Sequence, residues 1–139
     1  MNLIYLLGLL FFTSTIAAAS GLESPRTPPK SCESIISDIP TDPHELVQAR
    51  RIIINSSSQQ ATVNHYSARA YDLRSPSDIF KPEFVVENVY YSIRFEQDTG
   101  VLTLSASMNQ VVGILRPSES NQFWLTIGDD TSPEEVLCH

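Results

Sequence analysis

Two cysteines lie near opposite ends of this 139-residue chain, at Cys32 and Cys138. An even number of thiols in an exported chain favours one intramolecular disulfide. Such a bridge would enclose nearly the whole chain after residue 31 in one covalent loop, and a loop of about 100 residues stabilises a fold by roughly 4–5 kcal/mol in the chain-entropy model. We therefore expect a single domain over residues 32–139, closed by this disulfide.

The first twenty residues have the pattern of a signal peptide. They contain no charged side chain, and the apolar stretch over residues 3–12 is too short to span a bilayer. Small residues follow at Ala17, Ala18 and Ala19, so we expect cleavage after Ala19 or Ser20. Residues 21–31 are polar and rich in proline, which predicts a flexible tail. The protein is therefore expected to be secreted and extracellular, with no membrane segment.

The charge balance excludes several classes of function. Nine Lys and Arg against sixteen Asp and Glu give a net charge of −7, which disfavours a general nucleic-acid binder. Two cysteines and three scattered histidines do not form a metal-ligand pattern. Common nucleotide-binding and hydrolase motifs are also missing from the sequence. We expect no metal and no cofactor.

The pattern along the chain predicts an α+β fold. Asp42, Pro43 and Glu45 form a helix start signal, and Leu46, Ala49 and Ile53 follow at helical spacing. We therefore expect one N-terminal helix of about ten to twelve residues, with Arg50 and Arg51 facing outward. The helix is expected to pack on an antiparallel sheet of four to five strands.

The expected strands follow the helix as β-rich runs separated by turn signals. Residues 61–71 are expected to form an edge strand, and residues 84–95 a central strand. Further strands are predicted over residues 101–106, 111–115 and 123–127.

A few polar residues are candidates for chemistry on this sheet. His65, Glu87 and Arg94 together would supply a base, an acid and a cation, as phosphodiester cleavage requires. Alternatively, all three residues are ordinary exposed surface residues, because nothing in their spacing requires a functional site. Asn55 begins the sequence Asn-Ser-Ser, an acceptor site for N-glycosylation.

The order of these features resembles the secreted guanyl-specific ribonucleases of fungi. Those enzymes also combine an early cysteine, one helix, an antiparallel sheet and a penultimate cysteine. The resemblance is clearest in the C-terminal part and weaker in two central strands; the segments that carry it are residues 64–71, 84–93, 111–114, 121–126 and 135–138. It implies a microbial-ribonuclease fold over residues 32–138.

The catalytic positions of that family are not kept. Ala68 stands where the resemblance places a histidine, and Gln110 stands where it places an arginine. The sequence is therefore similar to the ribonuclease-like effectors that plant-pathogenic fungi secrete, although their aromatic-x-Cys motif is missing before Cys32. The resemblance implies a catalytically inactive protein that binds a host protein, or RNA, to suppress defence, with delivery into host cells as one route to the target. We expect the protein to be a monomer.

Two other functions remain open. Residues 71–76 and 98–103 are similar to segments of cadherin-type repeats, which would make the chain an extracellular β-sandwich adhesion module. An active secreted ribonuclease that uses His65 and Glu87 is the third hypothesis.

Overall fold

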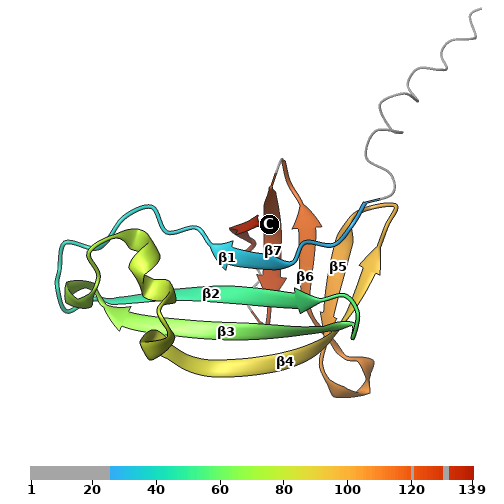
Figure 1. The fold of residues 1–139 in the computed structure, drawn as a ribbon, viewed down its shortest axis with the longest axis horizontal. Coiled ribbons are helices and arrows are strands. Elements are labelled where there is room, and N and C mark those ends of the chain that lie inside the picture. The colour runs from blue at the N-terminus through green and yellow to red at the C-terminus, as the bar shows by residue number, and fades with distance from the viewer. Residues whose placement is uncertain (1–25, 120, 130–131) are drawn as a thin grey trace, which may run out of the picture.

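The computed structural model describes residues 26–119, 121–129 and 132–139 (Figure 1). The predicted signal peptide, residues 1–20, lies outside the described residues, as does the first part of the predicted tail. The last part of that tail contacts the folded domain: Arg26 Nη1 donates to the carbonyl oxygen of Thr99 at 3.2 Å. Lys30 accepts a backbone hydrogen bond of 2.9 Å from Ile54.

The chain folds into a closed barrel in which each strand pairs with the next and β8 pairs with β1. All of these pairs are antiparallel. The strands are β1 (Ser31–Ser34), β2 (Leu46–Asn55), β3 (Gln60–Arg69), β4 (Val85–Glu96), β5 (Val101–Ser105), β6 (Val111–Pro117), β7 (Gln122–Ile127) and β8 (Glu134–Cys138). Four short 3-10 helices interrupt them: η1 (Ala70–Asp72), η2 (Pro76–Phe80), η3 (Pro82–Phe84) and η4 (Ser107–Asn109). Among the described residues, no helix is long and apolar enough to cross a membrane.

The predicted α+β fold is wrong, because the predicted helix is strand β2. Asp42 does act as a local cap, since its Oδ1 accepts a hydrogen bond from the amide of His44 at 2.9 Å, but only a turn forms there. Val47 and the run of isoleucines that follows are β-branched and favour an extended chain. The described part of the chain therefore contains neither a helix packed on a sheet nor the microbial-ribonuclease architecture, and it forms one closed sheet rather than the two-sheet sandwich of the adhesion module.

The remaining strands agree with the sequence pattern. Strands β3 to β7 overlap the five predicted runs. The expectation that residues 61–71 form an edge strand is wrong, since β3 pairs with β2 on one side and β4 on the other. The predicted disulfide is confirmed: Cys32 and Cys138 are bonded, and they face each other across the β1–β8 pair with Cα atoms 4.0 Å apart.

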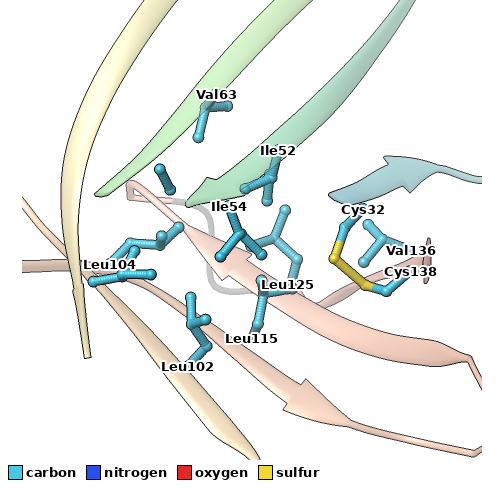
Figure 2. Close-up of a cluster of buried hydrophobic side chains, with 12 residues drawn as sticks. Cys32, Ile52, Ile54, Val63, Leu102, Leu104, Leu115, Leu125, Val136 and Cys138 are labelled. Atoms are coloured by element: carbon cyan, nitrogen blue, oxygen red, sulfur yellow. A yellow bond between two sulfur atoms is a disulfide. The ribbon is translucent and has the colours of Figure 1, made fainter. Parts of the chain in front are cut away.

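The main hydrophobic core fills one half of the barrel (Figure 2). An eight-stranded barrel has an interior just wide enough for side chains to fill. Leu102, Leu104 and Leu115 are fully buried there, and the disulfide lies at the side of the same cluster. The packing is close at Gly113, because a Cβ there would lie 3.1 Å from Leu104 Cδ1 and 3.2 Å from the carbonyl oxygen of Thr126.

A second core lies on the outer face of the β2–β3 pair. Side chains alternate between faces along a strand, so Ile52 points into the barrel and Val47 points outward. Elements η2 and η3 contact this part of the sheet, where Ile79 of η2 is fully buried. The long strands β2, β3 and β4 therefore extend beyond the barrel core, and their other half is covered on the outside (Figure 1).

Candidate functional site

The inward face of β2 and β3 changes from apolar to polar along the strands. Ile52 faces Val63 in the core, and the next inward pairs are Arg50 with His65 and Gln48 with Ser67. The alternation of side chains fixes this order, since positions two residues apart share a face. Polar groups therefore line the barrel interior beyond the end of its hydrophobic core.

These side chains surround a cavity of about 410 Å³. The cavity lies where β1 ends at Ser34 and β8 begins at Glu134. We call it the barrel mouth. Its lining consists of Ser34, Gln48, Ala49, Arg50, His65, Tyr66, Ser67, Val86, Glu87 and Glu134.

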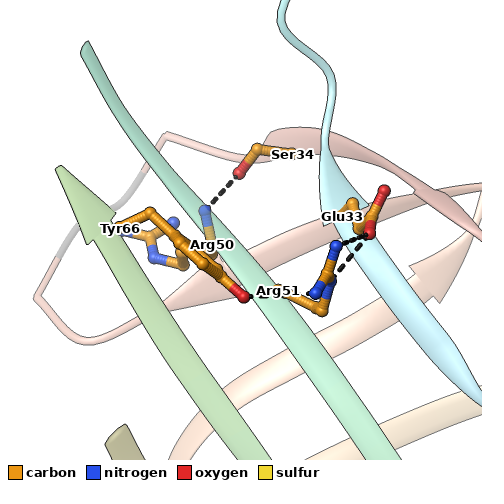
Figure 3. Close-up of polar contacts among 5 residues, drawn as sticks. All are labelled: Glu33, Ser34, Arg50, Arg51 and Tyr66. Carbon is orange, nitrogen blue, oxygen red and sulfur yellow. Dashed lines mark hydrogen bonds and ion pairs between the residues drawn. The ribbon is translucent and has the colours of Figure 1, made fainter. Parts of the chain in front are cut away.

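Arg50 connects the strands that close the barrel. Its Nη1 donates to Glu134 Oε1 at 2.5 Å. Its backbone amide donates to Ser34 Oγ at 2.9 Å (Figure 3). Its Nε is buried without a hydrogen-bond partner among the described residues. A buried donor without a partner costs free energy, so this atom favours a ligand or water at the mouth.

His65 lies between a cation and a carboxylate on adjacent strands. It faces Arg50 of β2 on one side and Glu87 of β4 on the other. Burial and the positive charge of Arg50 lower the pKa of His65 from 6.5, and the carboxylate of Glu87 opposes them. The imidazole is therefore neutral at pH 7, with one ring nitrogen that accepts and one that donates.

The structure brings together two of the three predicted site residues. His65 and Glu87 are direct cross-strand partners. Arg94 is not with them: it pairs with Thr103 of β5 and is exposed. Glu87 and Arg94 are separated by an odd number of positions in one strand, so their side chains point to opposite faces.

Arg50 is the cation that lies next to His65 and Glu87, the role predicted for Arg94. The helix interpretation placed Arg50 on an outward face, and the strand register places it inside the barrel. The sequence contains a pattern that could have placed Arg50 on the inward face. In the first half of β2 the apolar residues are at odd positions, Val47 and Ala49, and in the second half they are at even positions, Ile52 and Ile54. This change of parity indicates a strand that is buried on different faces in its two halves.

Arg51, the neighbour of Arg50, has a structural environment on the outer face. Its Nε and Nη2 each lie 2.7 Å from Glu33 Oε2, and its Nη1 donates to Tyr66 Oη at 3.3 Å (Figure 3). Its guanidinium carbon lies 5.1 Å from the ring centre of Phe80. Arg51 thus joins β1, β2, β3 and η2, and it is not part of the barrel mouth.

The predicted glycosylation site is exposed at the end of β2. Asn55 is the last residue of this strand, and its Oδ1 accepts hydrogen bonds from the amides of Ser57 and Ser58. The site lies in the β2–β3 turn, away from the barrel mouth. Its modification stays a prediction.

Within residues 26–119, 121–129 and 132–139, no group of three His, Cys, Asp or Glu side chains is placed to hold a metal ion. In comparisons with protein families, curated proteins and solved structures, no family model, protein or structure matches this chain.

Proposed function

We propose that this protein is an exported binding protein that holds a small polar ligand, or a polar side chain of a partner protein, in the barrel mouth. The observation that carries the proposal is the convergence of polar side chains around one cavity, beside the buried and unpartnered Nε of Arg50. Gln48, His65, Ser67 and Glu87 line it; Gln48 and Glu87 are exposed and His65 and Ser67 are half-buried, so a ligand can reach all four side chains. The cavity volume of about 410 Å³ lies within the range of small-molecule sites, and its polar lining would suit a polar ligand.

The charges at the mouth favour a cationic ligand. Arg50 and Glu134 are paired with each other, and His65 is neutral at pH 7, so Glu87 contributes the uncompensated charge. A protonated amine would find acceptors in the Glu87 carboxylate, a His65 ring nitrogen and Ser67 Oγ. The net charge of −7 adds a long-range attraction for cations.

Export and the host-directed role belong to the same proposal. The sequence of residues 1–20 and the Cys32–Cys138 disulfide support export, because disulfides persist in oxidising compartments. The role of suppressing host defence depends on the identity of the bound target. A ribonuclease fold does not support this role, because the chain forms an all-β barrel.

Three probes of similar size and different charge test the proposal: n-butylammonium, 1-butanol and butyrate, each titrated into the protein at pH 7 while amide NMR signals are followed. We expect n-butylammonium to shift the signals of residues 48–50 and 65–67, and butyrate to leave them unchanged. Glu87→Gln should weaken this binding about tenfold or more, since it removes the uncompensated charge. Glu83→Gln on η3, outside the mouth, is the matched control. If no probe shifts these signals, the mouth is not a binding site.

A second candidate function is acid–base cleavage of a phosphodiester. It is favoured by the direct adjacency of Arg50, His65 and Glu87 on three neighbouring strands. The pairing of Arg50 with Glu134 counts against it, because the guanidinium charge is already compensated. Incubation of RNA with the protein and with His65→Gln distinguishes the two functions: cleavage that His65→Gln abolishes would support the second.

A further inference from the structure

The outer face of the β4–β5 pair is polar where its inner face is apolar. Ile93 and Leu104 are cross-strand partners, and both are buried in the barrel core. Because side chains alternate along a strand, the residues on either side of this pair point outward. The outward pairs are Ser92 with Ser105 and Arg94 with Thr103.

Two hollows on this face meet at the Ser92–Ser105 pair, which lines both of them. The larger has a volume of about 690 Å³ and the smaller a volume of about 320 Å³. We call them together the β4–β5 hollow. The polar side chains used below are those of Gln59, Ser92, Arg94, Thr103, Ser105 and Asn109.

Two chain reversals form the walls of this hollow. Gln59 lies in the β2–β3 turn, and its carbonyl accepts a hydrogen bond of 3.0 Å from the amide of Ile93. Asn109 belongs to η4, whose loop is closed by a bond of 2.8 Å from the amide of Ala106 to the carbonyl of Gln110. Gln59 and Asn109 both have left-handed backbone, with φ of 55° and 62°, which is uncommon for residues other than glycine. The two amide side chains are therefore presented from a defined backbone.

Arg94 gives the hollow a positive charge. It is exposed, and it takes part in neither of the two ion pairs found among the described residues. The described lining of both hollows contains no Asp or Glu. The next carboxylate along this face of β4 is that of Glu96, which accepts a hydrogen bond of 3.2 Å from Thr99 Oγ1. Because a guanidinium can form two parallel hydrogen bonds with a carboxylate, the hollow favours a ligand with one carboxylate.

The rest of the polar lining is neutral. Serine and threonine hydroxyls and the side-chain amides of Gln59 and Asn109 each donate and accept hydrogen bonds. Ligand hydroxyl groups also do both, so they match this lining better than the oxygens of a simple anion, which only accept. Tyr90 is 72% exposed at the end of the smaller hollow, where its ring offers an apolar surface to the C–H groups of a ligand.

We propose that the β4–β5 hollow binds a hydroxylated carboxylate of the size of a sugar acid. Its carboxylate contacts Arg94, and its hydroxyl groups contact Ser92, Ser105 and Asn109. The hollow shares no lining residue with the barrel mouth, so this inference does not depend on ligand binding there. The two sites take ligands of opposite charge.

Three probes test the proposal in NMR titrations at pH 7: D-glucuronate, D-glucose and acetate. We expect D-glucuronate to shift the amide signals of residues 92–94 and 103–105. D-Glucose lacks the carboxylate and acetate lacks the hydroxyl groups, so each should bind about tenfold more weakly. Added salt should weaken the binding of D-glucuronate and not that of D-glucose, because Arg94 is exposed to solvent.

Variants separate the roles of the charge and the hydroxyl groups. Arg94→Gln should weaken the binding of D-glucuronate about tenfold and leave that of D-glucose unchanged. Ser105→Ala should weaken the binding of both sugars, because it removes a hydroxyl that lines both hollows. Arg116→Gln, at an exposed arginine of β6 outside the hollow, is the matched control and should bind like the wild type.

Circular dichroism of the variants shows whether the barrel remains folded. If D-glucuronate leaves the signals of residues 92–94 and 103–105 unchanged, the proposal is overturned. Acetate that binds as tightly as D-glucuronate would also overturn it, since the hydroxyl groups would then contribute nothing. The same holds if Arg94→Gln and Arg116→Gln have equal effects on the binding of D-glucuronate.

Discussion

Removal of the disulfide should cost this domain a large part of its stability. Cys32 and Cys138 are buried at 0% and 2% exposure and are 106 positions apart in the sequence. In the chain-entropy model, a loop of that length contributes about 5 kcal/mol by restricting the unfolded chain. Because net stabilities of domains are about 5–15 kcal/mol, the double variant Cys32→Ala/Cys138→Ala should lie close to its unfolding limit at room temperature.

The structure explains why the rest of the molecule cannot easily replace this bond. Strand β1 has four residues and β8 has five, and their short ladder, continued by backbone hydrogen bonds of His139 with Lys30 and Ser31, joins the two ends of the described chain. Without the covalent link, closure of the barrel depends on these short ladders. The entropy of bringing chain ends together over a long loop then opposes closure.

Urea unfolding, followed by the fluorescence of Trp124 on β7, measures the effect, because the chain contains one tryptophan. With a urea dependence of about 2 kcal/mol per molar, the unfolding midpoint should fall by roughly 2 M or more. Reduction of the wild-type disulfide is the control, since it opens the loop without changing a buried side chain. A loss of less than about 1 kcal/mol in both experiments would refute the reasoning.

Three further predictions follow from individual residues. The unfolded chain binds a proton at His65 more readily than the folded chain, because the folded pKa is lowered from 6.5. The stability contribution of the neutral His65 should therefore be fully present above pH 6.5 and be lost as the pH falls from 6.5 toward the lowered folded pKa. His65→Gln should remove this part of the pH dependence of the melting temperature. Gly100→Ala should cost more than Gly128→Ala in thermal unfolding. Both glycines have positive φ, at 74° and 66°, but only at Gly100 would the added Cβ meet other atoms, including Pro117 Cγ at 2.9 Å, whose ring cannot swing away as the end of the Arg26 side chain can. Strain alone predicts about 1–2 kcal/mol at either position. Expression in a eukaryotic secretory host should add the mass of one glycan, which Asn55→Gln removes in mass spectrometry.

The sequence predicted most strands but not the fold class. The alternating and β-branched runs that became β3 to β7 carry a direct period-two signal. Residues 42–53 carry two competing signals, a cap at Asp42 and Pro43 and a β-branched run at Ile52–Ile54. The strand interpretation prevails because β2 pairs with β1 and β3 along its length, and these contacts are distant in sequence. Local capping signals contain no information about such pairing.

The candidate site was predicted in part for the same reason. His65 and Glu87 were identified by residue type, and the β3–β4 register confirms that they are neighbours. Arg94 lies apart from them. It was chosen by residue type, and its position on the strand faces could not be read from the sequence. Arg50 was missed because it was assigned to a helix. The register between strands decides which side chains meet, and it depends on the closure of the whole barrel.

The pKa of His65, measured by NMR titration, tests the central claim that Arg50, His65 and Glu87 share one site. Glu87→Gln should lower this pKa further, because it removes the one neighbouring charge that raises it. Arg50→Gln should raise the pKa, since it removes a charge that lowers it, and Arg94→Gln should leave it unchanged. A pKa that responds to Arg94→Gln, or to neither of the other substitutions, would contradict this arrangement of the barrel mouth.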